Sequence, residues 1–215
     1  MKTIKNSIKA FIKNPEIIFI FIALYVVITL FNKIPSLPSP SAITDLIYKI
    51  SSKLILALIF SFFLSIFIGA SYLSLKNKFS FKKSIKYYKF TFLTFIFILP
   101  VLIVSYLSTN YLFPFLEFSA WLSMILNEFL FVIISALSLS FIMKQIINSK
   151  MKLKNYILTL LVFVLYYPLT YLLDKFIGLF PDNTQLLIYI ILYFIIIYPI
   201  ITLILTSLFE NVSSK

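Results

Sequence analysis

Side chains that could do chemistry are scarce in this sequence, and the most conspicuous is a carboxylate inside an apolar stretch. Glu128 follows Asn127 within the run 119–147. A carboxylate at the centre of a bilayer costs about 2.5 to 3.5 kcal/mol on insertion scales, so it marks a candidate functional position. Two placements stay open. If the helix begins near residue 119, Glu128 is about ten residues deep, and if it begins near residue 126, Glu128 is interfacial.

Four hydroxyl-bearing residues form a second candidate group, beside Pro168 and Pro199 near the middle of two apolar runs. They are Tyr167, Thr170, Tyr198 and Thr202. A proline removes one backbone hydrogen bond from a helix, and in transporters broken helices line midplane binding sites. Prolines are also ordinary in membrane helices, where neighbouring hydroxyls satisfy the freed carbonyls. A polar intramembrane site and simple helix packing are therefore both open.

The chain lacks the residues on which most enzyme chemistry depends. It contains no Cys, no His and only two Gly. These absences exclude disulfides, thiolate metal sites, imidazole bases and glycine-rich phosphate loops. Neither a nucleophile elbow nor a pair of closely spaced carboxylates occurs. The sequence therefore predicts a protein that is not an enzyme and that has no metal site and no cofactor.

Composition indicates a membrane protein. Of the 215 residues, 61% are hydrophobic and 12% are charged, and the mean hydropathy is +1.05. A soluble domain is nearer half apolar and a quarter charged. Six runs can cross a hydrocarbon core of about 30 Å as helices, and they are 16–34, 54–75, 90–107, 119–147, 156–173 and 185–209. Their apolar residues fall on both parities, which favours helices over barrel strands. The sequence predicts an all-α bundle of about six transmembrane helices in one membrane domain, 1–215.

The lysines predict an orientation. All 19 basic residues are Lys, and the net charge is +12. Fifteen of them lie before the first run, after the second run, from Lys144 at the end of the fourth run to the start of the fifth, or at the C-terminus. The positive-inside rule then places both termini in the cytoplasm of a multi-pass protein of the cell membrane. Because the lysines occur in short segments between apolar runs, the charge does not indicate a nucleic-acid partner.

Residues 1–14 form a basic amphipathic segment. One helical stripe consists of Lys2, Lys5, Lys9 and Lys13, and a roughly opposite stripe consists of Ile4, Ile8, Phe11 and Ile12. A helix of this kind lies in the cytoplasmic headgroup layer. An interfacial anchor is the simpler role, and lipid sensing is the alternative.

The second run carries a stripe of small residues. Ala57, Ser61, Ser65 and Gly69 recur every four residues. Small residues at this spacing allow another helix to approach closely. The stripe is therefore predicted to be buried by helix packing, and this role is favoured over contact with a substrate.

Two basic segments resemble each other, Lys5-Asn6-Ser7-Ile8-Lys9 and Lys82-Lys83-Ser84-Ile85-Lys86. Each precedes an outward-going run, so the chain is open to interpretation as three helical hairpins repeated in parallel. Lysine-rich inner loops of any membrane protein would give similar matches.

The order of elements resembles a known group. A short basic helix ending in Asn14-Pro15 is followed by six apolar runs. At the end of the second run, Gly69-Ala70-Ser71-Tyr72 precedes the second basic segment. This order resembles a loose group of uncharacterised prokaryotic six-helix membrane proteins, which includes the membrane domain attached to some glycerophosphodiester phosphodiesterases. The sequence has no counterpart of the phosphodiesterase catalytic domain, so the resemblance implies a fold and no activity.

Two functions remain as hypotheses. The first is a non-enzymatic membrane component that assists lipid or protein organisation, with the lipid bilayer as its partner. The second is a small transporter or the permease subunit of a complex, working with other membrane subunits or a separate ATPase. The prolines and Glu128 favour the second, and the scarcity of charged residues and Gly inside the runs favours the first.

Overall fold

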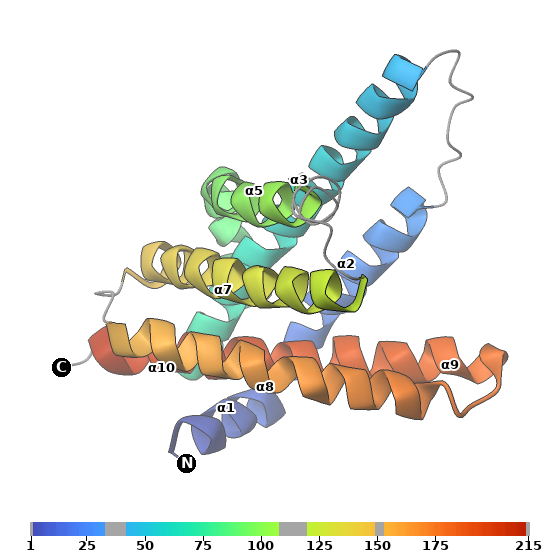
Figure 1. The fold of residues 1–215 in the computed structure, drawn as a ribbon. Helices are drawn as coiled ribbons and strands as arrows, with labels where there is room; N and C mark the ends of the chain where they lie inside the picture. Colours follow the sequence, from blue (N-terminus) through green and yellow to red (C-terminus); the bar gives the residue numbers. More distant parts are fainter. Residues whose placement is uncertain (1, 33–41, 108–119, 149–152, 214–215) are drawn as a thin grey trace.

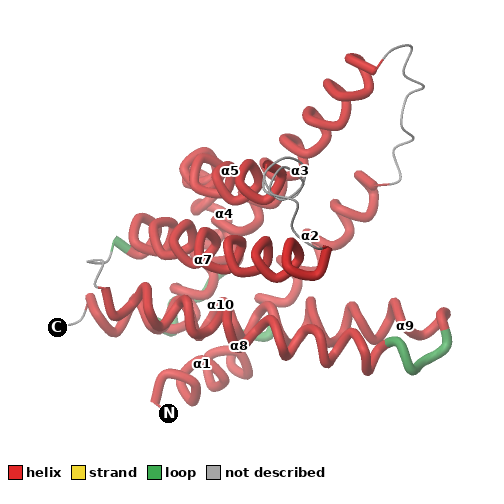
Figure 2. The backbone as a smooth tube through the Cα atoms, in the orientation of Figure 1, coloured by secondary structure: helices red, strands yellow, loops and turns green. Residues whose placement is uncertain are grey.

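The computed structural model describes residues 2–32, 42–107, 120–148 and 153–213, and these contain helices, short loops and no strand (Figure 2). The predicted all-α class is therefore confirmed. In chain order the elements are α1 (Lys2–Lys13), α2 (Ile17–Asn32), α3 (Ala42–Leu75), α4 (Phe81–Ile85), the 3-10 turn η1 (Lys86–Phe90), α5 (Thr91–Leu107), α7 (Ala120–Ile147), α8 (Leu153–Ile177), α9 (Asp182–Tyr189), the π-helix η3 (Ile190–Ile197) and α10 (Tyr198–Ser213).

Five helical stretches are long and apolar enough to cross a membrane. They are Ile50–Leu75, Phe81–Val104, Phe129–Ile147, Leu153–Ile177 and Thr184–Phe209. They correspond to the last five of the six predicted runs, so the chain has the helices of a membrane-embedded bundle. The first predicted run corresponds to α2, whose 16 residues extend about 24 Å and do not reach across about 30 Å of hydrocarbon. A sixth span is counted only when α1 and α2 are taken together.

Helices α1 and α2 meet at an angle of 80°. The sequence causes the corner, because Pro15 disfavours helical geometry at Asn14. The side-chain amide of Asn14 then donates to the carbonyl of Ala10 at 3.1 Å and to Oγ of Ser74 at 2.7 Å. The first bond satisfies a carbonyl at the end of α1, and the second fixes the corner to α3. Helix α1 is thus held across the direction of α2.

At the ends of α3 and α7, an asparagine occupies the left-handed position that is usually a glycine. Asn77 and Asn148 have φ angles of 54° and 53°, in the left-handed region that Asn tolerates better than most residues. After α3, the amide of Asn77 donates to the carbonyl of Ser74, and the amide of Lys78 donates to that of Leu73. This pair of bonds is a Schellman motif, and it turns the chain sharply toward α4.

Helix α3 is the centre of the bundle, with α2, α5, α7 and α10 packed around it (Figure 1). Half of its most apolar segment is buried within the protein, whereas 6% of the corresponding segment of α8 is. Helix α8 contacts α7 and α10 along one side and leaves large apolar residues exposed, including Leu165 and Leu172. The exposed side of α8 therefore suits contact with lipid chains.

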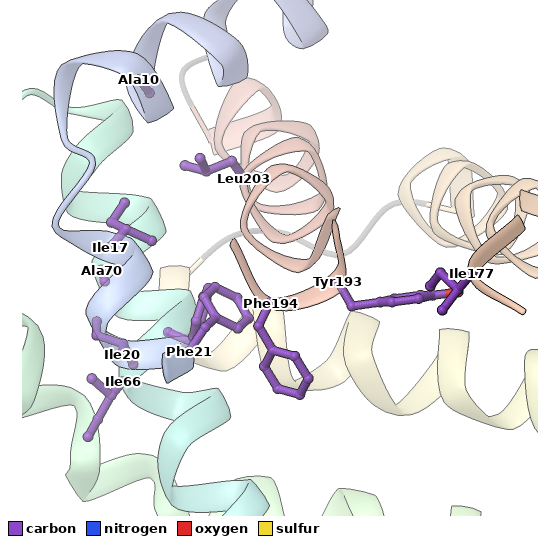
Figure 3. Packing of buried hydrophobic residues seen from close by; sticks show 11 residues of the cluster. Ala10, Ile17, Ile20, Phe21, Ile66, Ala70, Ile177, Tyr193, Phe194 and Leu203 are labelled. Carbon is purple, nitrogen blue, oxygen red and sulfur yellow. The ribbon is translucent and has the colours of Figure 1, made fainter. Parts of the chain in front are cut away.

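Two clusters of buried side chains hold the bundle together. The first joins α1, α2, α3, α8, η3 and α10, and its largest members are the aromatic rings of Phe21, Phe67, Tyr193 and Phe194. Figure 3 shows Phe21 between α2 and the η3–α10 helix, while Tyr193 extends toward Ile177 of α8. The ring of Phe194 lies 5.0 Å from that of Tyr25 on α2, measured between centroids. The second joins α3, α7 and α10 around Met143 and Phe209. Because α3 and α10 contribute to both clusters, they connect the two halves.

Candidate functional site

The most distinctive polar group inside the bundle is the hydroxyl of Tyr193. Its side chain is 2% exposed, although it extends from η3 toward α8. The hydroxyl oxygen lies 2.8 Å from Oδ1 of Asp174 and 3.0 Å from the carbonyl oxygen of Thr170, so one hydroxyl hydrogen serves two acceptors on α8. Hydrogen bonds to a carboxylate are stronger than those between neutral groups. This contact therefore links η3 to the end of α8 specifically.

Further tyrosines extend this group into a cluster. The ring of Tyr193 lies 4.5 Å from that of Tyr189 and 5.8 Å from that of Tyr198, measured between centroids. The hydroxyl of Tyr198 interacts electrostatically with those of Tyr166 and Tyr189. We call Tyr166, Asp174, Tyr189, Tyr193 and Tyr198 the tyrosine cluster. It joins α8 to the helix formed by α9, η3 and α10.

The π-helix brings the tyrosines together. In a regular α-helix, Tyr193 and Tyr198 would point about 140° apart, because each residue turns the chain by about 100°. In η3 each turn contains more residues, and the amide of Tyr198 donates to the carbonyl of Tyr193, five residues back. The wider turn places the two rings near one face.

Pro199 ends the widened segment. Its side chain is fully buried, it has no amide hydrogen, and in α-helical geometry its ring would crowd the carbonyl of Ile195. The widened turn just before Pro199 relieves this crowding. Such π segments recur at functional sites, which makes the tyrosine cluster the best-formed candidate site among the described residues.

The hydroxyl group predicted from the prolines is only partly assembled. Tyr198 belongs to the cluster, and Thr170 contributes its backbone carbonyl. Thr202 donates its hydroxyl to the carbonyl of Tyr198 at 2.9 Å, within its own helix. Tyr167 lies in α8, and its side chain is outside the described part of the structure. Sequence reasoning therefore identified one cluster tyrosine, Tyr198, and did not identify Tyr193.

The signal that sequence reasoning missed is Asp174. The predicted fifth span ends at residue 173, which assigned Asp174 to the loop that follows. In the structure α8 continues to Ile177, so Asp174 lies on its last turns, and its carboxylate accepts the bond from Tyr193. In the helix that faces α8, Tyr189 and Tyr193 are four residues apart in the sequence. That spacing predicts that both rings lie on one helix face.

The predicted pair Asn127 and Glu128 lies in α7, which begins at Ala120. Both positions are therefore helical along the backbone and follow the helix start by seven and eight residues. Their side chains lie outside the described part of the structure. The intramembrane role of Glu128 stays a prediction.

The small-residue stripe of α3 faces the interior. Ala57, Ser61, Ser65 and Gly69 are all buried. Ser61 donates to the carbonyl of Ala57 at 2.7 Å, and Ser65 donates to that of Phe62 at 2.9 Å. The stripe therefore satisfies its own hydroxyls. At Gly69 the close neighbour is the ring of Tyr87 from η1, which lies where a Cβ atom would be.

Four buried polar atoms have no hydrogen-bond partner among the described residues. They are Oγ of Ser71, Oγ1 of Thr94, Oγ of Ser140 and Nδ2 of Asn155. An unpaired buried polar group costs about 1 to 3 kcal/mol. The four atoms come from α3, α5, α7 and α8, and none of them is hydrogen-bonded to another, so they do not form a site comparable with the tyrosine cluster.

Within the described residues, no group of three His, Cys, Asp or Glu side chains is placed to hold a metal ion. Comparisons of the chain with protein-family models, with curated proteins and with solved structures find no match. The resemblance drawn from the order of elements therefore stays a prediction, and function must be argued from the chemistry of the chain.

Proposed function

We propose that the protein is a non-enzymatic, multi-pass component of the cell membrane. One observation carries the proposal, namely that five Ser and Thr hydroxyls inside the bundle bond to the backbone of their own helices. Ser61, Ser65, Thr159, Thr202 and Thr206 each donate to a carbonyl three or four residues earlier. A hydroxyl whose hydrogen is engaged in this way does not donate that hydrogen to a substrate at the same time.

The proposal includes an orientation with both termini in the cytoplasm. The lysine distribution supports this orientation through the positive-inside rule. The contact between Nζ of Lys13 and Oδ1 of Asn77, at 2.9 Å, adds support because it joins two lysine-rich segments at one end of the bundle. One leaflet would therefore face most of the positive charge.

Flux measurements on the purified protein in liposomes test the proposal. A dye trapped inside the vesicles reports entry of protons, and a second dye reports entry of potassium. A passive component should give fluxes equal to those of empty liposomes. A flux above this level that disappears in Glu128→Gln or Asp174→Asn would refute the proposal, because a carboxylate would then be coupled to ion movement.

A transport subunit is the second candidate, and the tyrosine cluster favours it. The pair formed by Tyr193 and Asp174 places an exposed carboxylate beside a buried tyrosine of the π-helix, which ends at Ile197, two residues before Pro199. Linked hydroxyls and carboxylates of this kind line ion and proton pathways in membrane proteins. If transport occurs, Tyr193→Phe should lower the flux while the protein remains folded. Tyr88→Phe, on an exposed side chain, is the matched control.

A further inference from the structure

Helix α1 has three distinct faces, because successive residues are about 100° apart around its axis. The first face is buried and carries the small residues Ser7 and Ala10, and α1 contacts α10 and α3. Figure 3 shows Ala10 on α1. The next face is apolar yet exposed, and it consists of Ile4, Ile8 and Ile12. The third face carries the exposed side chains of Lys5, Lys9 and Lys13. An apolar stripe and a basic stripe therefore adjoin on the side of α1 that faces away from the protein.

Helix α1 is fixed to the turn that follows α3. Lys13 donates to Oδ1 of Asn77 at 2.9 Å, and Asn14 donates to Oγ of Ser74 at 2.7 Å. Ser74 in turn donates to the carbonyl of Ala10 at 3.2 Å. These three bonds hold the end of α1 against the last turn of α3 and against Asn77, where the segment 76–90 begins. The two lysine-rich segments therefore meet at this corner, and we call them together the basic surface.

The charge of this surface is positive throughout. Its exposed lysines are Lys5, Lys9, Lys13, Lys76, Lys78, Lys82, Lys83, Lys86 and Lys89. No Asp or Glu occurs in residues 1–15 or 46–116, and Glu16 is the one acid at the corner of α1 and α2. Such a surface attracts anionic groups, and isoleucines beside it suit hydrocarbon chains.

Other occupants fit this surface less well. A nucleic acid would neutralise the lysines but would leave the isoleucine stripe against water or phosphate. A second copy of the chain could cover the isoleucines but would bring two basic surfaces together, and like charges repel. An anionic phospholipid has both a negative headgroup and acyl chains, so it complements both stripes at once.

We propose that α1 and the lysine-rich segment 76–90 form a docking surface for anionic phospholipids, with Ile4, Ile8 and Ile12 among the acyl chains and the lysines on the phosphates. The proposal requires that the chain lie in a bilayer, and it holds whether or not the protein also transports a substrate. Each lysine close to an anionic surface favours binding by about fivefold. The surface should therefore collect anionic lipids around α1 from a mixed bilayer.

The test measures which lipids gather at α1. Because the chain contains no Cys, Ile12→Cys carries a single fluorescent donor in a nanodisc of phosphatidylcholine and phosphatidylglycerol. The acceptor dye is attached to one lipid or to the other. We expect severalfold more energy transfer to labelled phosphatidylglycerol than to labelled phosphatidylcholine. The preference should fall in about 1 M salt, where the screening length is near 3 Å.

Two comparisons make the test specific. Replacing Lys5, Lys9 and Lys13 by Gln should remove most of the preference, whereas Lys53→Gln with Lys175→Gln, at other exposed lysines, should keep it. A donor at Leu179, which is 80% exposed in the turn before α9, should show no preference. The proposal is overturned by equal transfer to both lipids, by a preference that survives the triple replacement, or by the same preference at Leu179. Cross-linking of two copies through position 12, without transfer to either lipid, would instead identify a second chain as the occupant.

Discussion

The contact between Gly69 and Tyr87 is the tightest constraint at the scale of single residues. A Cβ atom on Gly69 would overlap the ring of Tyr87, including the ring carbon nearest its backbone. This ring carbon, Cγ of Tyr87, is attached close to the backbone, so rotation of the side chain does not move it away and η1 would have to shift. We expect Gly69→Ala to lower the free energy of unfolding by about 1 to 3 kcal/mol, as overpacking does, and thermal unfolding in detergent measures the loss.

The second glycine provides the control. A Cβ atom on Gly178 would meet the carbonyl oxygens of Asp174 and Lys175 at 3.4 and 3.5 Å, which is ordinary contact. Gly178→Ala should therefore leave the unfolding temperature unchanged or raise it slightly. Adding Tyr87→Ala should also remove part of the penalty of Gly69→Ala. If Gly69→Ala proves as harmless as Gly178→Ala, the ring does not occupy this position.

The hydroxyl of Tyr193 makes a separate prediction. Tyr193→Phe keeps the ring in the core but removes the bonds to Asp174 and Thr170. The expected loss is about 1.5 kcal/mol, because a hydrogen bond to a charged group contributes more than a neutral one and the exposed side of Asp174 weakens that gain. Thermal unfolding should show this loss, and Tyr88→Phe, at a side chain that is 56% exposed, should show none. Equal unfolding temperatures for the two variants would mean that the contact with α8 does not stabilise the fold.

At the scale of elements, the stripe on α3 predicts a steric effect. Ser65 is fully buried on a helix that is packed on several sides. Ser65→Leu adds volume where none is free, so we expect a loss of about 1 to 3 kcal/mol and a lower unfolding temperature. The matched change is Phe60→Leu, at a position on the same helix that is 41% exposed. It should be nearly neutral, and similar losses for both would place the stripe outside the packed interface.

Phe63, on the same helix, shows why an exposed face is harder to predict than a buried one. Phe63 lies between Ser61 and Ser65 in sequence but is not part of the small-residue stripe, and it packs against the first core cluster. Nearly every residue of α3 is apolar, so periodicity does not separate lipid from protein on its two sides. Small residues carry the information because only protein backbones approach them closely.

The presence of the long helices could be predicted from the sequence, but the residues at which they begin and end were predicted less accurately. Apolar run length predicts the spans, since every span must satisfy its own backbone. Helix α3 begins at Ala42, whereas the predicted run begins at residue 54. The run was defined by apolar residues alone, and the helix also includes polar residues before it, such as Ser51 and Ser52. The corner at Asn14-Pro15 was readable from the proline. The π-helix was not, because it depends on how Pro199 and the rings of η3 pack in three dimensions.

At the scale of the whole molecule, the candidate site was only partly predictable. The prolines pointed to Tyr198 because they interrupt spans, which is a local property. The pairing of Tyr193 with Asp174 joins residues 19 positions apart. That contact depends on the length of α8 and on the turn that follows it, and neither is encoded in a short motif. Single-sequence patterns identify elements, whereas contacts between elements require their packing.

The last prediction concerns how the whole chain is threaded through the membrane. Asn148 is exposed at the end of α7, and Leu179 is exposed in the turn between α8 and α9, so the 25 residues of α8 separate them. A helix of that length covers about 37 Å, enough to cross the hydrocarbon core. Lysines around residue 148 outnumber those around residue 179, so the positive-inside rule places Asn148 in the cytoplasm.

Single cysteines report this arrangement directly, because the chain has none of its own. In intact cells an impermeant maleimide should label Leu179→Cys, and it should label Asn148→Cys only after the membrane is permeabilised. The reverse pattern would invert the orientation, since the lysines of α1 and of segment 76–90 would then face outward together with Asn148. Labelling of both cysteines in intact cells would place both ends of α8 on one side. In that case its exposed apolar face would lie along the bilayer instead of crossing it.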